Sequence, residues 1–153
     1  MAEPAPTPDA DLYERDFYAW TQDQAAKLRA RAHNAIDWEN AAEEIETLGR
    51  SEKRELESRL GVLLLHLLKW RYQPEGRSNS WRGTINEQRR RIGREIVASP
   101  SLAGYPGQIL YEEYPDARLK AAGETGLSEE TFPLDCPFTI DQILHETFYP
   151  ETD

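Results

Sequence analysis

The sequence contains few residues that could cross-link the chain or hold a metal. Its 153 residues include one cysteine, one methionine and three histidines. A single cysteine, Cys136, can form neither an internal disulfide nor a cysteine-based zinc site. A chain of this length buries roughly 70% of the surface that its unfolded form exposes, so a hydrophobic core can stabilise it without cross-links.

A long hydrophobic run is also missing. The longest one, residues 60–68, is interrupted by a glycine and by His66, and it is much shorter than the roughly 20 residues of a transmembrane helix. The N-terminus has proline at every second position from 4 to 8 and lacks the basic start and apolar stretch of a secretory signal. We therefore expect no membrane span, a cytoplasmic location, a flexible leader over residues 1–11 and a single helical domain over residues 12–150.

Several common catalytic signatures are absent. The sequence has no Gly-x-x-x-x-Gly-Lys phosphate loop, no dinucleotide fingerprint, no Gly-x-Ser-x-Gly elbow and no paired-cysteine motif. These motifs place backbone amides, nucleophiles or metal ligands around a substrate. Their absence makes a non-enzymatic protein the leading hypothesis.

Charge is abundant but unevenly distributed. The 28 acidic and 18 basic residues give a net charge of −10. Residues 1–50 carry a net −6, residues 51–100 a net +5 and residues 101–153 a net −9. The simplest interpretation is that acidic outer segments neutralise a basic central one within the fold. The overall negative charge argues against a general nucleic-acid binder, because phosphate affinity needs accumulated positive charge.

Apolar residues recur at helical spacing through most of the chain. This periodicity predicts helices over about 16–33, 38–72, 80–98 and 106–124. Pro115 lies inside the fourth and predicts either a kink or a split there. No useful run alternates with the period of a strand. We therefore expect an all-α fold with four main helices in an up-down or irregular bundle.

The C-terminal part has a different composition. After Gly126 the chain is punctuated by proline and rich in aromatic residues, which predicts an irregular strap laid over the bundle. Thr139 and Gln142 then form a capping-box pattern, which predicts one short helix from Ile140.

Several segments together resemble one protein family. They are residues 16–20, 37–46, 63–70, 80–81, 87–91 and 136–139, in order along the chain. In these segments the chain is similar to domain-of-unknown-function family twenty-nine, over about residues 12–150. The resemblance implies an all-helical, cytoplasmic bacterial protein. It implies no assigned activity, ligand or catalytic residue.

Three carboxylates of the second predicted helix are candidates for metal ligands. Glu39, Glu43 and Glu46 are spaced by four and three residues, so they share one helical face. Helical bundles build divalent-metal sites from such faces, although the Glu-x-x-His partner motif is missing here. The alternative is a solvated acidic face, or one paired to arginines. A divalent metal is thus possible, and otherwise no cofactor is expected.

The third predicted helix carries the one dense basic cluster. Arg82 and Arg89 are seven residues apart and share a face, and Arg90 and Arg94 form another. These arginines could contact nucleic acid. The interpretation that we favour is that they form ion pairs with acidic parts of the fold, for example Arg89 with a glutamate of the second helix.

His66 lies within the leucine run, where a lone imidazole is usually a neutral core residue with one hydrogen bond. Gln88 is the partner that we expect for it. If His66 instead converged with Glu43, Glu46 and Arg89 on an open cavity, the four would be catalytic candidates.

Three hypotheses of function follow. The first is a small bacterial interaction or regulatory protein that binds a partner protein or another copy of itself. The second is a metal-assisted, nuclease-like hydrolase that uses the glutamate face together with His66 or Arg89. The third is a non-catalytic contact of the basic helix with nucleic acid.

Overall fold

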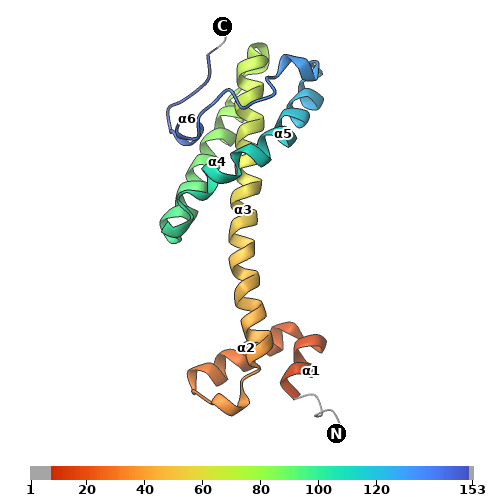
Figure 1. The fold of residues 1–153 in the computed structure, drawn as a ribbon, viewed down its shortest axis with the longest axis vertical. Coiled ribbons are helices and arrows are strands. Elements are labelled where there is room, and N and C mark those ends of the chain that lie inside the picture. Colours follow the sequence, from red (N-terminus) through yellow and green to blue (C-terminus); the bar gives the residue numbers. More distant parts are fainter. Residues whose placement is uncertain (1–7, 152–153) are drawn as a thin grey trace. The chain divides into compact units, whose positions relative to one another are not determined.

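The computed structural model describes residues 8–151, which form α-helices and short 3-10 helices and contain no strand. The predicted all-α fold is therefore confirmed (Figure 1). Most of the expected leader, residues 1–7, lies outside the described residues. The first helix, α1, begins at Pro8, within the range that was predicted to be a flexible leader. In the described part, no helix combines the length and the apolar character that crossing a membrane requires.

The chain divides into two compact units, residues 1–51 and 52–153. The first unit contains α1 (Pro8–Arg15), α2 (Phe17–Arg29), a 3-10 turn (His33–Ala35) and the beginning of α3 (Trp38–Tyr72). The sequence predicted one helix over 16–33 and missed α1. The predicted start agrees with that of α2, where the Asp16 side chain accepts a hydrogen bond from the Ala19 N–H at 3.0 Å, but α2 ends at Arg29 rather than near residue 33.

Aromatic and polar contacts hold α1 and α2 to the start of α3. Trp20 is buried, its ring packs edge-on against Tyr13, and its indole N–H donates to Asp37 at 3.1 Å. The amide oxygen of Gln24 accepts from the Asp37 N–H at 2.8 Å. The Tyr13 hydroxyl donates to Glu44 on α3. These contacts fix one face of α3 within the first unit.

The second unit contains the rest of α3, α4 (Asn79–Ala98), α5 (Tyr105–Thr125) and α6 (Ile140–Leu144). Figure 1 shows α4 and α5 against this part of α3. The α3 bounds agree with those predicted from the sequence. Six leucines of α3 are completely buried, namely Leu56, Leu60, Leu63, Leu64, Leu67 and Leu68. Ile85 and Ile92 of α4 pack in the same core, which makes α3 the central element of this unit.

Pro115 does not split α5, which runs continuously from Tyr105 to Thr125. Proline lacks the N–H that would bond four residues back, so one helical hydrogen bond is missing at that point. The helix ends at Gly126, whose φ of 73° is left-handed and whose N–H donates to Ala122. Glycine adopts this conformation without a steric penalty.

The C-terminal strap covers the core, as its composition predicted. Phe132 and Phe138 are buried, and the Phe132 carbonyl accepts from Arg118 at 2.9 Å. Both hydrogen bonds of the predicted capping box between Thr139 and Gln142 are present and open α6.

Candidate functional site

The acidic face of α3 lies on the surface of the first unit. Glu43 and Glu46 both pair with Arg50 of the same helix, at 3.4 and 3.8 Å, and all three side chains are about half exposed or more. Glu39 is also exposed. The partly buried glutamate of this segment is Glu44, whose carboxylate accepts a hydrogen bond from the Tyr13 hydroxyl. Glu44 was not among the sequence candidates.

No metal site is assembled from these carboxylates in the structure. Over residues 8–151, no three His, Cys, Asp or Glu side chains are placed to hold one ion together. Glu39, Glu43 and Glu46 therefore share a face, as their spacing indicated, without forming a three-ligand site. Metal binding by this face stays a prediction.

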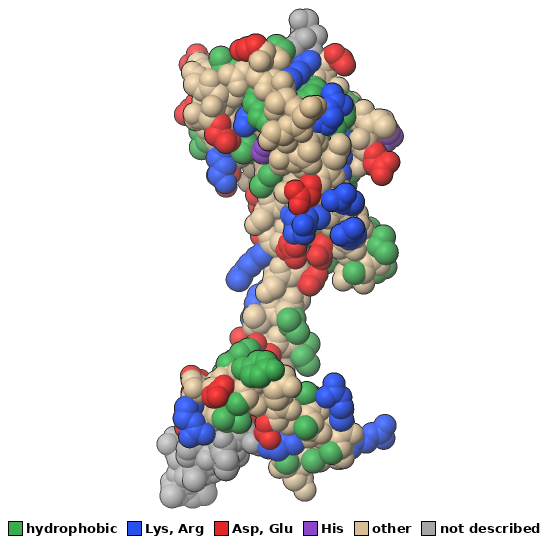
Figure 2. All heavy atoms as spheres, turned by 180° about the vertical axis from the view of Figure 1, so that it is seen from behind, with side chains coloured by type: hydrophobic (Ala, Val, Ile, Leu, Met, Phe, Trp, Pro, Cys, Tyr) green, Lys and Arg blue, Asp and Glu red, His purple; other side chains and the backbone are tan. Residues whose placement is uncertain are grey.

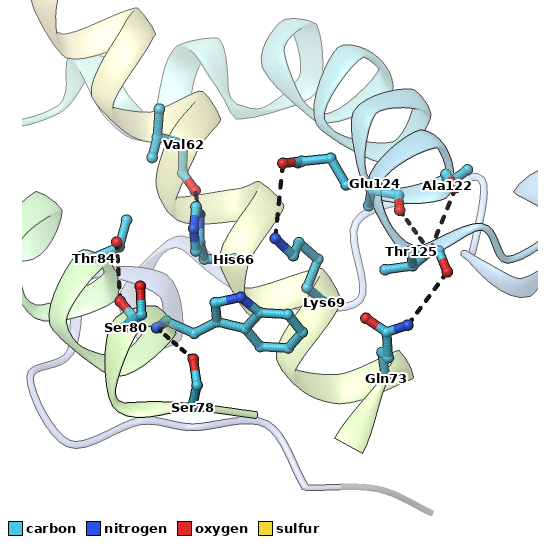
Figure 3. Close-up of polar contacts among 12 residues, drawn as sticks. Val62, His66, Lys69, Gln73, Ser78, Ser80, Thr84, Ala122, Glu124 and Thr125 are labelled. Atoms are coloured by element: carbon cyan, nitrogen blue, oxygen red, sulfur yellow. Dashed lines mark hydrogen bonds and ion pairs between the residues drawn. The ribbon is translucent and has the colours of Figure 1, made fainter. Parts of the chain in front are cut away.

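His66 lies on α3 in the second unit and is half-buried (Figure 3). Its Nδ1 lies 2.8 Å from the Val62 carbonyl oxygen, which can only accept, so Nδ1 carries the proton. Burial is the main cause that lowers the pKa of His66, and the positive charge of Lys69 lowers it further. The expected partner was wrong, because Gln88 instead accepts from Arg59 at 3.3 Å.

A buried lysine lies one turn further along α3. The ammonium of Lys69 is 3.8 Å from Glu124 of α5 and 4.6 Å from the ring centre of Trp81 on α4. Figure 3 shows Lys69 directed toward Glu124, with Gln73 reaching Thr125 in the next turn. These contacts join three helices. On His66, the hydrogen bond of Nδ1 to the Val62 carbonyl leaves Nε2 as the ring atom that can accept a proton.

Arg89 is buried, and it binds backbone rather than a carboxylate. Its guanidinium donates to the carbonyl oxygens of Ile143 at 2.8 Å and Phe148 at 2.7 Å. Longer hydrogen bonds reach Gln142 and Glu146. The predicted ion pair of Arg89 with Glu43 or Glu46 is thus replaced by a clamp on the segment that contains and follows α6. Burial lowers the pKa of Arg89.

The two arginine faces predicted from the sequence are present on α4. On the first, beside Arg89, the guanidinium of Arg82 lies over the rings of Trp70 and Tyr149 at 5.1 and 4.8 Å. On the second, Arg90 and Arg94 are exposed. Arg82, Arg90 and Arg94 are all exposed, but Arg82 stacks on two rings of the fold and Arg89 is buried, so Arg90 and Arg94 are the two of the four arginines that have no described partner.

The apolar stripe of α3 is exposed in the first unit and buried in the second. In the sequence, Ile45, Leu48 and Leu56 recur at helical spacing on α3, with Glu52 at the turn between Leu48 and Leu56, and Leu56 is fully buried in the second unit. In the first unit Ile45 and Leu48 are 69% and 67% exposed, and Trp38, seven residues before Ile45, is 56% exposed. Figure 2 shows hydrophobic side chains on the visible surface of this unit. We call Trp38, Ile45 and Leu48 the exposed stripe.

Comparison with known proteins adds a family and nothing more specific. A family model described as domain of unknown function DUF29 matches residues 12–149. The chain belongs to this family. The match confirms the resemblance that the sequence motifs indicated over almost the same residues. No curated protein and no solved structure matches the chain, so the DUF29 assignment brings no activity, ligand or partner with it.

Proposed function

We propose that this DUF29 chain is a protein-binding module whose exposed stripe on α3 receives a basic, amphipathic helix of a partner protein. The observation that supports the proposal is the exposure of Ile45 and Leu48 on a stripe whose continuation is fully buried. Large apolar side chains grouped on one helical face are a common mark of an interaction site. Ala42 and Gly49, also exposed, lie three residues before and four residues after Ile45, next to it on the same helical face, and would let a second helix approach closely.

The charges beside the stripe support a basic partner. Glu39, Glu43 and Glu46 lie along the same part of α3, and Arg50 is the one basic residue of that segment. A helix with Lys or Arg beside its apolar residues would complement this border, whereas an acidic helix would be repelled. Burying Ile45 and Leu48 against such a helix would contribute about 1 to 3 kcal/mol for each side chain.

Peptide binding to the purified chain tests the proposal. The probe is a synthetic helix with a leucine stripe flanked by lysines, and its control has glutamates in place of the lysines. Binding is measured by fluorescence anisotropy at two salt concentrations. We expect the lysine peptide to bind more tightly than the glutamate peptide and to weaken as salt rises.

Variants assign that binding to the stripe. Ile45→Asp combined with Leu48→Asp should abolish it, while Val97→Asp, at an exposed aliphatic residue of the second unit, should not change it. Lysine-peptide binding that survives the double substitution, or glutamate-peptide binding that the double substitution abolishes to the same extent, would contradict the proposal. Concentration-dependent dimerisation that the double substitution removes would assign the stripe to a second copy of the chain instead.

A further inference from the structure

A second surface, of opposite charge, lies in the other unit. A cleft of about 900 Å³ separates α4 from the segment that contains the end of α6. Arg90, Arg94 and Val97 line it on the α4 side, and Leu144 and Glu146 line it on the other. The cleft lies within the second unit and shares no residue with the exposed stripe.

The positive charge of this cleft is not neutralised inside the fold. Arg90 and Arg94 lie one turn apart on α4 and are exposed, and within residues 8–151 neither forms an ion pair or a side-chain hydrogen bond. Their neighbour Arg91, in contrast, is paired with Glu87 at 3.0 Å. Arg89 also lines the cleft; its guanidinium binds carbonyl oxygens and lies over the Tyr149 ring, and it has no described carboxylate partner. Glu146 is the one acidic residue among the described lining.

The same cleft offers aliphatic surface. Val97 is 80% exposed, one turn beyond Arg94 on the face of α4 that borders the cleft. Leu144 lies opposite and is half-buried. Gly93, between the two free arginines, leaves the α4 backbone uncovered there. A ligand that fills the cleft can therefore place an apolar group against Val97 and Leu144 while its anionic groups reach Arg90 and Arg94.

We propose that this cleft binds an acidic segment of a partner protein, in which Asp or Glu residues flank an aliphatic side chain. Guanidinium groups bind carboxylates with two parallel hydrogen bonds. Two observations favour a peptide over nucleic acid. No aromatic residue is among the described lining, so nothing there can stack on a base. Two free arginines also provide few phosphate contacts in a chain of net charge −10.

The test uses the full chain and three fluorescein-labelled probes. They are a short peptide of alternating Asp and Leu, the same peptide with Lys in place of Asp, and a single-stranded RNA oligonucleotide. We expect the acidic peptide to bind with an affinity that falls as salt rises and the RNA not to bind, while any binding of the lysine peptide should not depend on Arg90 and Arg94. Arg90→Gln combined with Arg94→Gln should raise its Kd about tenfold, which corresponds to roughly 0.7 kcal/mol for each lost charge pair.

Arg91→Gln is the matched control, because it removes one positive charge from the same helix outside the cleft lining. It should change the Kd less than twofold. Val97→Ser should weaken the acidic peptide without changing its dependence on salt. All of these positions are exposed, so the variants should unfold at the wild-type temperature.

Three outcomes would overturn the proposal. The first is an acidic-peptide affinity that the double substitution leaves unchanged. The second is RNA binding that depends on Arg90 and Arg94, which would make the cleft a nucleic-acid site. The third is self-association that the same substitution abolishes, which would make a second copy the occupant. None of these outcomes bears on the exposed stripe of α3, whose test uses basic peptides and different variants.

Discussion

The Nε of Arg89 donates a hydrogen bond to the carbonyl oxygen of Ile143 at 2.8 Å, across 54 residues of sequence. The guanidinium is almost completely buried, and its acceptors are all backbone carbonyls. Ile143 and Gln142 belong to the last turn of α6; the Gln142 carbonyl also accepts from the His145 N–H at 3.2 Å, whereas Arg89 is the described donor to the Ile143 carbonyl. Arg89 thus supplies the donor that the Ile143 carbonyl would otherwise lack and the positive charge that a helix C-terminus favours.

Replacing Arg89 should therefore destabilise the second unit strongly. We expect Arg89→Ala to lower the free energy of unfolding by about 3 kcal/mol, because buried carbonyls lose their donor. Arg89→Lys should recover only part of this loss, since an ammonium cannot reproduce the planar fork. Urea denaturation measures the effect, and hydrogen exchange should show faster exchange around α6. Arg91→Ala is the control and should cost less than about 0.5 kcal/mol; equal effects of both substitutions would refute the clamp.

Two leucines of α3 provide a direct test of the exposed stripe. Leu56→Ala should cost about 2 to 5 kcal/mol, because it leaves a cavity in the core. Leu48→Ala should cost less than about 0.5 kcal/mol, because that side chain is 67% exposed. Thermal unfolding of both variants at one protein concentration measures the difference. A large loss at Leu48 would show that this residue is covered in solution.

Glu95 should make stability depend on pH. Its side chain shares a hydrogen bond with Glu52, and this contact, with burial and the charges of Glu55 and Glu52, raises the pKa of Glu95 to about 7 from 4.5, against the opposing charge of Arg59. The folded state then holds a proton that the unfolded state releases at lower pH. Stability should fall as pH rises from about 4.5 to 7 and level off above it.

The variant Glu95→Gln removes that titration. The difference in unfolding temperature between Glu95→Gln and wild type should favour the variant more at pH 8 than at pH 4.5. Glu87→Gln, on the same helix but paired with Arg91, serves as the control and should not change the pH profile in this way. Parallel profiles for wild type and Glu95→Gln would show that the two carboxyl groups do not share a proton.

His66 should be neutral at pH 7, with its proton on Nδ1. The Val62 carbonyl fixes this tautomer, and burial lowers the pKa of His66 below its usual 6.5. Because the unfolded state takes up the proton first, the contribution of His66 to stability is lost as pH falls below about 6.5. Long-range proton–nitrogen NMR correlations report both tautomer and midpoint. A midpoint at or above that of the urea-unfolded chain would contradict the burial argument.

Local signals in the sequence predicted most helix bounds well. Asp37 immediately precedes α3, and its side chain accepts a hydrogen bond from the Asn40 N–H at 3.4 Å. The leucine stripe then continues nearly to the C-terminal end of α3. The capping pair of Thr139 and Gln142 located α6 from two residues alone. Such patterns succeed because caps and apolar spacing are properties of a single helix. The missed helix, α1, begins at Pro8 and follows a proline-rich segment that gave no helical signal.

The candidate site was harder to predict, because it depends on which elements cover which faces. Ile45 and Leu56 both belong to the apolar stripe of α3, yet of the two side chains only that of Leu56 is buried. The role of Arg89 was also hidden, since its acceptors are backbone carbonyls and every residue has one. The spacing of the arginines still separated Arg82 and Arg89 from Arg90 and Arg94, because that separation is fixed by the helix itself.

The clamp on the α6 segment also sets an order for folding during synthesis. Arg77 donates to the Pro150 carbonyl across 73 residues and Arg89 to Phe148 across 59, so both arginines leave the ribosome long before their acceptors. Until then the guanidinium of Arg89 has only water to bind. The hydrogen bonds described above for the first unit, in contrast, join residues between Tyr13 and Glu44, so we expect that unit to fold while the second is still being made.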